Sequence, residues 1–142
     1  MKTYYLAYGM NTNLDGMATR CPQAESLGKV TVPGHKLAFK TFCDAVVSPK
    51  DSMECALWLI TEQCEKNLDA LEGFPDFYGK KEVEVEFKGK PIRAMIYYMT
   101  DHYGFGAPSE GYLNMVVEGY HSHNMPIMQI VQALEDITVC TS

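Results

Sequence analysis

The chain has 142 residues, of which 46% are hydrophobic and 21% are charged, as in ordinary globular proteins. Its formal net charge of -6 argues against nucleic acid or an anionic membrane surface as a partner. The length suits a single domain covering residues 1–142.

The five cysteines are scattered and form no Cys-x-x-Cys pair, which predicts reduced thiols. The sequence opens directly on strand-like residues, without an apolar signal core. No apolar run approaches the roughly 18 residues of a membrane span. We therefore expect a cytoplasmic protein without a membrane partner.

The N-terminal region has the pattern strand, tight loop, helix. Thr3 to Tyr8 is short and rich in aromatic residues, which predicts a buried strand, and Leu14 to Arg20 has the spacing of a short helix. Between them, Gly9 to Asn13 supplies glycine and helix-capping residues. Such a turn can direct backbone N–H groups towards a carboxylate or an oxyanion. A plain connection between the two elements is the alternative.

The middle of the chain predicts several strands. Leu27 to Val32 and Lys36 to Phe42 flank the turn signal Pro33-Gly34-His35 and are expected to form a hairpin. Ala45 to Ser48 is a short candidate strand, and Met53 to Ile60 is a strongly apolar one. Two further strands, Glu82 to Phe87 and Ile92 to Met99, are joined by a turn at residues 88–91.

The C-terminal third changes character. A loop from Thr100 to Pro108, of a kind that often borders a site, leads to a helix capped by Ser109. A last helix opens at Asn124 and Pro126. The whole pattern predicts an α+β fold, a curled sheet or small mixed β-barrel of about six or seven strands with flanking helices.

A helix that Thr61 can cap ends abruptly at Gly73, which leaves Glu72 as its last side chain. The helix macrodipole and the apolar residues that follow, including Phe74 and Tyr78, both favour the neutral carboxyl and raise its pKa. Glu72 is therefore a candidate proton shuttle near neutral pH. A solvated residue at an ordinary helix end is the alternative.

Other chemistries find little support. His121 and His123 lie close together, but no further ligand completes a metal site. The motifs of serine hydrolases, nucleotide-binding loops and zinc proteases are absent. Cys21 and Cys64 have no neighbouring histidine in the sequence and are expected to be core thiols. We expect neither a metal nor a cofactor.

Three tyrosines, Tyr8, Tyr78 and Tyr112, resemble Glu72 in standing at element ends beside glycine or proline. Side chains at such positions can converge on a cleft. Tyrosines are more often half-buried packing residues, and periodicity alone does not show convergence.

The order and spacing of these segments resemble the gamma-glutamylcyclotransferase-like family. The stretch Tyr5-Leu6-Ala7-Tyr8-Gly9-Met10-Asn11 is similar to its Tyr-Gly-Ser-Asn loop, and Arg20-Cys21-Pro22 to its Arg-x-Pro. Leu68 to Gly73 resembles its Leu-Asp-x-x-Glu-Gly segment, and Tyr78 stands where the family has a tyrosine soon after that glutamate. Pro108 to Tyr112 resembles its Pro-Ser-x-x-Tyr segment. The matches span most of the chain, and the departure is Met10, where the family usually has a small residue.

The resemblance implies release of 5-oxoproline from a small γ-glutamyl compound, with Glu72 as the catalytic residue. It implies that the substrate is bound by the loop residues Tyr5, Leu6, Ala7, Tyr8, Gly9, Met10 and Asn11 together with Tyr78 and Tyr112. Two alternatives stay open: a binding or interaction module that kept the pocket, and an unrelated structural barrel.

Overall fold

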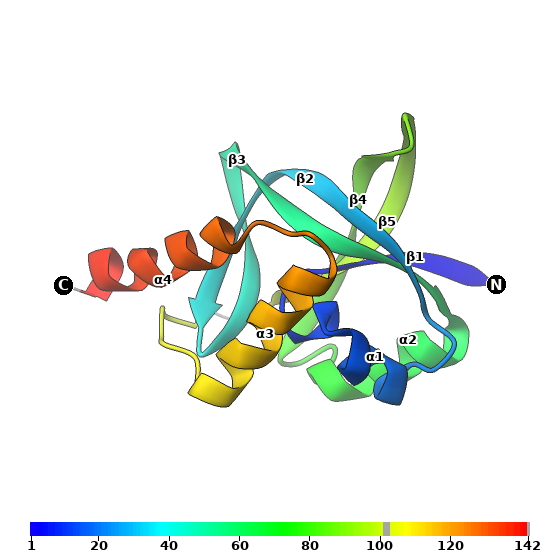
Figure 1. The fold of residues 1–142 in the computed structure, drawn as a ribbon, viewed down its shortest axis with the longest axis horizontal. Helices are drawn as coiled ribbons and strands as arrows, with labels where there is room; N and C mark the ends of the chain where they lie inside the picture. Colours follow the sequence, from blue (N-terminus) through cyan, green and yellow to red (C-terminus); the bar gives the residue numbers. More distant parts are fainter. Residues whose placement is uncertain (101–102, 142) are drawn as a thin grey trace.

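The computed structural model describes residues 1–100 and 103–141. Within them, a mixed sheet is accompanied by helices that gather mainly on one side of it (Figure 1). The elements in chain order are β1 (Lys2–Ala7), the 3-10 turn η1 (Met10–Thr12), α1 (Leu14–Arg20), β2 (Glu25–Lys40), β3 (Phe42–Thr61), α2 (Glu62–Glu72), β4 (Tyr78–Phe87), β5 (Lys90–Met99), α3 (Glu110–Ser122) and α4 (Ile127–Thr141).

The sheet has the strand order β2-β3-β1-β5-β4, with β1 at its centre. β1 runs antiparallel to β3 and parallel to β5, so that Tyr5 pairs with Trp58 on one side and with Met95 on the other. This confirms the predicted α+β class. The sheet is curled but not closed, because no ladder joins its edge strands β2 and β4 among the described residues. The expectation of a barrel is corrected to an open, curled sheet.

The strand count is lower than expected because β2 and β3 are unusually long. The segment around Pro33-Gly34-His35 is not a hairpin turn; the chain continues through it with a register shift against β3. The turn lies instead at Thr41, whose φ of 72° reverses the chain between Lys40 and Phe42. The predicted hairpin was therefore wrong, and the predicted short strand at 45–48 is part of β3.

Other predicted boundaries are confirmed. The Thr61 side chain caps α2 by accepting a hydrogen bond from the Cys64 N–H at 3.2 Å. β4 and β5 form the expected hairpin, with Lys88 and Gly89 at positive φ in its two-residue turn. Ser109 caps α3 through the Tyr112 N–H, as predicted.

The predicted loop from Thr100 to Pro108 is described only in part, since residues 101–102 lie outside the described residues. Gly106 lies along the β2–β3 turn, where its N–H donates to Phe39 O at 3.1 Å. None of the helices in the described part of the chain is long and apolar enough to cross a membrane.

One hydrophobic core unites the sheet and the helices. Its fully buried side chains include Leu6 from β1, Leu57 from β3, Ile96 from β5 and Leu68 from α2. Because β1 and α2 are both anchored in this core, the loop after β1 and the end of α2 are held in fixed positions relative to each other.

Helix α3 packs directly on the turn η1, and a glycine makes this possible. A Cβ added at Gly119 would lie 2.1 Å from Thr12 Oγ1 and 2.6 Å from the Thr12 carbonyl carbon. Real Cβ atoms do not approach backbone so closely. The contact therefore requires glycine at position 119. It holds α3 against the loop that follows β1.

We predict that Gly119→Ala lowers the free energy of unfolding by about 1–3 kcal/mol, since the backbone of α3 or of η1 must shift to admit the methyl group. The control is Gly111→Ala in the same helix, where an added Cβ meets nothing within 4 Å. That change should be neutral or stabilising, because alanine is the better helix former. Urea unfolding of both variants measures this, and a Gly119→Ala protein as stable as the parent would contradict the packing argument.

Candidate functional site

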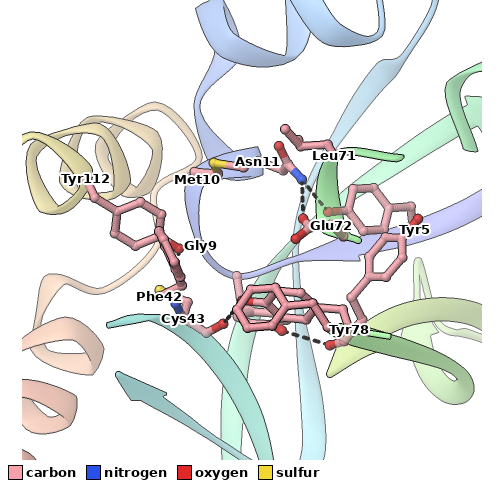
Figure 2. A pocket seen from close by; sticks show the side chains of 13 residues that line it. Tyr5, Gly9, Met10, Asn11, Phe42, Cys43, Leu71, Glu72, Tyr78 and Tyr112 are labelled. Carbon is pink, nitrogen blue, oxygen red and sulfur yellow. Dashed lines mark hydrogen bonds between the residues drawn. The ribbon is translucent and has the colours of Figure 1, made fainter. Parts of the chain in front are cut away.

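A pocket of about 120 Å³ lies where the end of β1, the end of α2 and the β2–β3 turn meet (Figure 2). Its size suits a small ligand rather than a large cofactor. The residues that line it are Tyr5, Tyr8, Gly9, Met10, Asn11, Phe42, Cys43, Leu71, Glu72, Phe77, Tyr78, Tyr97 and Tyr112.

Glu72 is the acidic residue of this lining, and the way in which α2 ends determines its position. Gly73 adopts the left-handed conformation with a φ of 66°, and the Phe74 N–H donates to Asp69 O at 2.9 Å. Together with the bond from the Gly73 N–H to Ala70 O, these features form a Schellman motif. The helix therefore ends at Glu72, whose half-buried side chain lies against the loop that follows β1.

Asn11 connects that loop to the carboxyl group. Its Nδ2 donates to Glu72 Oε1 at 3.2 Å and to Tyr5 Oη at 2.9 Å, as Figure 2 shows. Its backbone carbonyl accepts a hydrogen bond of 3.0 Å from the indole of Trp58 on β3. The Asn11 Oδ1 is buried without a hydrogen-bond partner among the described residues. Asn11 is thus fixed from two sides and keeps one acceptor atom unused.

Burial raises the pKa of Glu72 from its ordinary value of 4.5 to about 7, while the positive charge of Arg20 and the hydrogen bond from Asn11 act in the opposite direction. Desolvation is the larger effect because the carboxyl is surrounded by aromatic and aliphatic side chains. A carboxyl with this pKa is present in both protonation states near neutrality. It can therefore both take up and return a proton there.

The backbone of the loop carries donors that its own turn leaves unpaired. Met10 and Asn11 open the turn η1, so their N–H groups have no partner within it, and its first internal bond runs from the Thr12 N–H to Gly9 O. Gly9 allows a close approach: a Cβ there would lie 2.9 Å from Cys43 Cβ and 3.0 Å from Tyr112 Oη.

Three tyrosines form much of the wall, and each is fixed by a hydrogen bond. Tyr8 Oη donates to Tyr97 O at 2.8 Å, and Tyr78 Oη donates to Cys43 O at 2.6 Å. Tyr112 Oη accepts from the Cys43 N–H at 3.1 Å. Burial raises the pKa of all three phenols, so they stay neutral. The wall is preorganised and uncharged.

The structure brings most of the sequence-predicted residues to this one place. Glu72 and seven of the nine predicted substrate-binding residues line the pocket, namely Tyr5, Tyr8, Gly9, Met10, Asn11, Tyr78 and Tyr112. Leu6 and Ala7 do not. Their side chains lie in the strand β1 and are buried in the core.

Five lining residues were not among the predicted site residues: Phe42, Cys43, Leu71, Phe77 and Tyr97. Phe42 and Cys43 reach the pocket from the β2–β3 turn, which was predicted about eight residues too early. A correct placement of that turn would have pointed to them. Tyr97 arrives through the parallel pairing of β5 with β1, for which the sequence contains no local signal.

The pocket offers no activated nucleophile or metal site. Burial raises the pKa of the Cys43 thiol to about 12, so it is not a thiolate at neutral pH. No cluster of metal-ligating side chains exists among the described residues. His123, considered as a ligand from the sequence, instead contacts Ser26 Oγ through its Nε2 at 2.7 Å.

The fold and this pocket define a class of small α+β proteins in which a loop after the central strand faces a carboxyl at a helix end. The sequence model of the family described as gamma-glutamyl cyclotransferase, AIG2-like, matches residues 5–119. The chain belongs to this family.

Solved structures show the same fold. A protein described as gamma-glutamyl cyclotransferase matches with a TM-score of 0.80 and 23% identity, over 99% of this chain and 88% of the other. The uncharacterized human protein loc79017 matches with a TM-score of 0.80 and 25% identity, over 98% and 88%. YkqA from Bacillus subtilis has a TM-score of 0.80 and 17% identity, over 96% and 54%. No curated protein sequence matched the chain significantly.

We predict that the parent protein loses stability as the pH rises from about 5 to 8. The folded-state pKa of Glu72 lies above its unfolded value, so the native state binds the proton more tightly, and that advantage disappears as the pH rises through about 7. The full effect is about 3 kcal/mol by linkage. Glu72→Gln should remove this part of the slope, whereas Glu110→Gln, which changes an exposed carboxylate, should keep it. Denaturant unfolding across this pH range measures both slopes, and equal slopes for the parent and Glu72→Gln would contradict the burial argument.

Proposed function

We propose that this protein is a γ-glutamyl cyclotransferase, which converts a γ-glutamyl amide into 5-oxoproline and a free amine, with Glu72 as the general acid and base. The observation that carries the proposal is the half-buried Glu72 carboxyl, with a pKa near 7, that accepts a hydrogen bond from Asn11 inside the pocket. Family membership and the fold shared with a protein described as gamma-glutamyl cyclotransferase support the same activity.

In this reaction the nucleophile is part of the substrate. The α-amine of the glutamyl group attacks its own γ-carbonyl carbon, a C–N bond closes the five-membered ring, and the original amide C–N bond breaks. Two protons leave the α-ammonium nitrogen by way of Glu72, one before the attack and one as the ring closes. Both pass to the nitrogen of the broken amide bond, which departs as an ammonium ion, so atoms and charges balance without water or a cofactor. A pocket that lacks an activated serine or cysteine is sufficient for this chemistry.

The remaining residues would hold the substrate in the folded pose that cyclisation requires. The N–H groups of Met10 and Asn11 can donate either to the developing oxyanion or to the substrate α-carboxylate. Tyr78 and Tyr112 would limit the space on the far side of the glutamyl chain, because their rings are fixed by bonds to Cys43.

We predict that Glu72→Gln reduces kcat/KM by about 100- to 10,000-fold, since the amide keeps the shape of the side chain but cannot exchange a proton. Release of 5-oxoproline from a panel of γ-glutamyl amines and γ-glutamyl amino acids measures this. The circular dichroism spectrum of the variant should match that of the parent. A variant as active as the parent on a substrate that the parent converts would refute the role of Glu72.

A parent protein that binds 5-oxoproline but converts no member of the panel would instead indicate a binding module that kept the pocket. In that case Glu72→Gln would have no turnover to lose.

A further inference from the structure

The mouth of the pocket carries large apolar side chains that remain open to solvent. Phe42, at the β2–β3 turn, is 42% exposed, and Leu71, one residue before Glu72, is 44% exposed. Both line the pocket, as does the partly buried Phe77. We call these three residues the apolar rim. Their exposure costs hydration free energy that burial against an apolar ligand would recover.

The two aromatic rings of the rim are held in position rather than loosely extended. The Phe42 ring packs edge-on against Tyr112 at 5.3 Å and against Phe77 at 6.2 Å between ring centroids. Phe77 in turn packs against Tyr78 at 4.9 Å and Tyr103 at 5.2 Å. The rings therefore form a preorganised surface that loses little conformational entropy when a ligand binds.

The rim also lacks a positive charge. None of the described residues that line the pocket is lysine, arginine or histidine. Lys80 is already bound to Glu65 and Asp69, at 2.5 and 2.9 Å, and Lys40 is bound to Asp44 at 2.7 Å.

Arg20 lies close enough to act on the charge of Glu72, but it does not line the pocket, and its guanidinium donates to Met10 O at 3.3 Å. A carboxylate placed at the rim would therefore meet the charge of Glu72 without a cation of its own.

We propose that the apolar rim binds the departing group of the substrate, and that this group is an apolar or aromatic primary amine without a carboxylate. The inference rests on the proposed function, since it assigns the amine side of the same reaction. The glutamyl part occupies the inner pocket, beside Glu72 and Asn11, and the substituent on the amide nitrogen extends over Phe42 and Leu71. The products are 5-oxoproline and the apolar amine, and no further reactant enters.

The test uses pairs of substrates that differ only in one carboxylate. γ-Glutamyl-phenethylamine is compared with γ-glutamyl-phenylalanine, and γ-glutamyl-isoamylamine with γ-glutamyl-leucine. γ-Glutamyl-methylamine serves as the reference without an apolar group. We expect kcat/KM for 5-oxoproline release to be at least about tenfold higher for the amine than for the amino acid in each pair, and about tenfold higher for phenethylamine than for methylamine.

Two variants locate the effect. Phe42→Ala should lower the phenethylamine-to-methylamine ratio of kcat/KM by about tenfold, and Phe42→Leu, which keeps apolar bulk at this exposed turn, by less. The control is Phe87→Ala at the far end of β4, which should leave the ratio at the parent value.

The outcomes separate the two proposals. If the amino-acid derivatives are converted as well as or better than their amine partners, or if Phe42→Ala leaves the ratio unchanged, the rim assignment is overturned while the cyclotransferase activity stands. If no γ-glutamyl compound is converted, the proposed function fails and the rim assignment fails with it.

Discussion

The site depends on the burial of one carboxyl group at the end of a helix. Placing Glu72 at the negative end of α2 and among aromatic side chains disfavours its ionised form, and the Asn11 amide offsets only part of that cost. If only stability mattered, a solvated residue would be favoured at this position. Two features hold Glu72 in this position. The Schellman motif at Gly73 ends the helix there, and Leu68, one turn earlier, anchors the helix in the core.

Strand β3 determines where both halves of the site stand. Its Trp58 indole binds the carbonyl of Asn11 and so fixes the loop after β1, while its last residue, Thr61, caps the helix that ends in Glu72. Because β3 also pairs with β1 along its length, the loop and the helix end have little freedom to move apart. The β2–β3 turn then brings Phe42 to the mouth of the pocket. The same hairpin therefore both fixes the loop after β1 and contributes a residue to the apolar rim.

The features that depend on a few neighbouring residues were predicted correctly from the sequence. The caps at Thr61 and Ser109, the stop at Gly73 and the β4–β5 turn all follow from residue types with strong conformational preferences, and all are confirmed. The β2–β3 hairpin was misplaced because Pro33-Gly34 carries a stronger turn signal than Thr41, although long-range pairing with β3 keeps the chain extended there. Tyr97 and Phe42 reach the pocket through strand order and strand length, which no short stretch of sequence encodes.

A crystal structure of the protein with 5-oxoproline would show directly whether Glu72 faces the reacting nitrogen. We expect the lactam ring to lie in the pocket between Tyr78 and the loop at residues 9–11, with its amide nitrogen about 2.6–3.2 Å from the Glu72 carboxyl or one water away. The opposite face of the ring should point towards Phe42. A ring bound elsewhere on the surface, or bound in the pocket with Glu72 turned away from its nitrogen, would contradict the account.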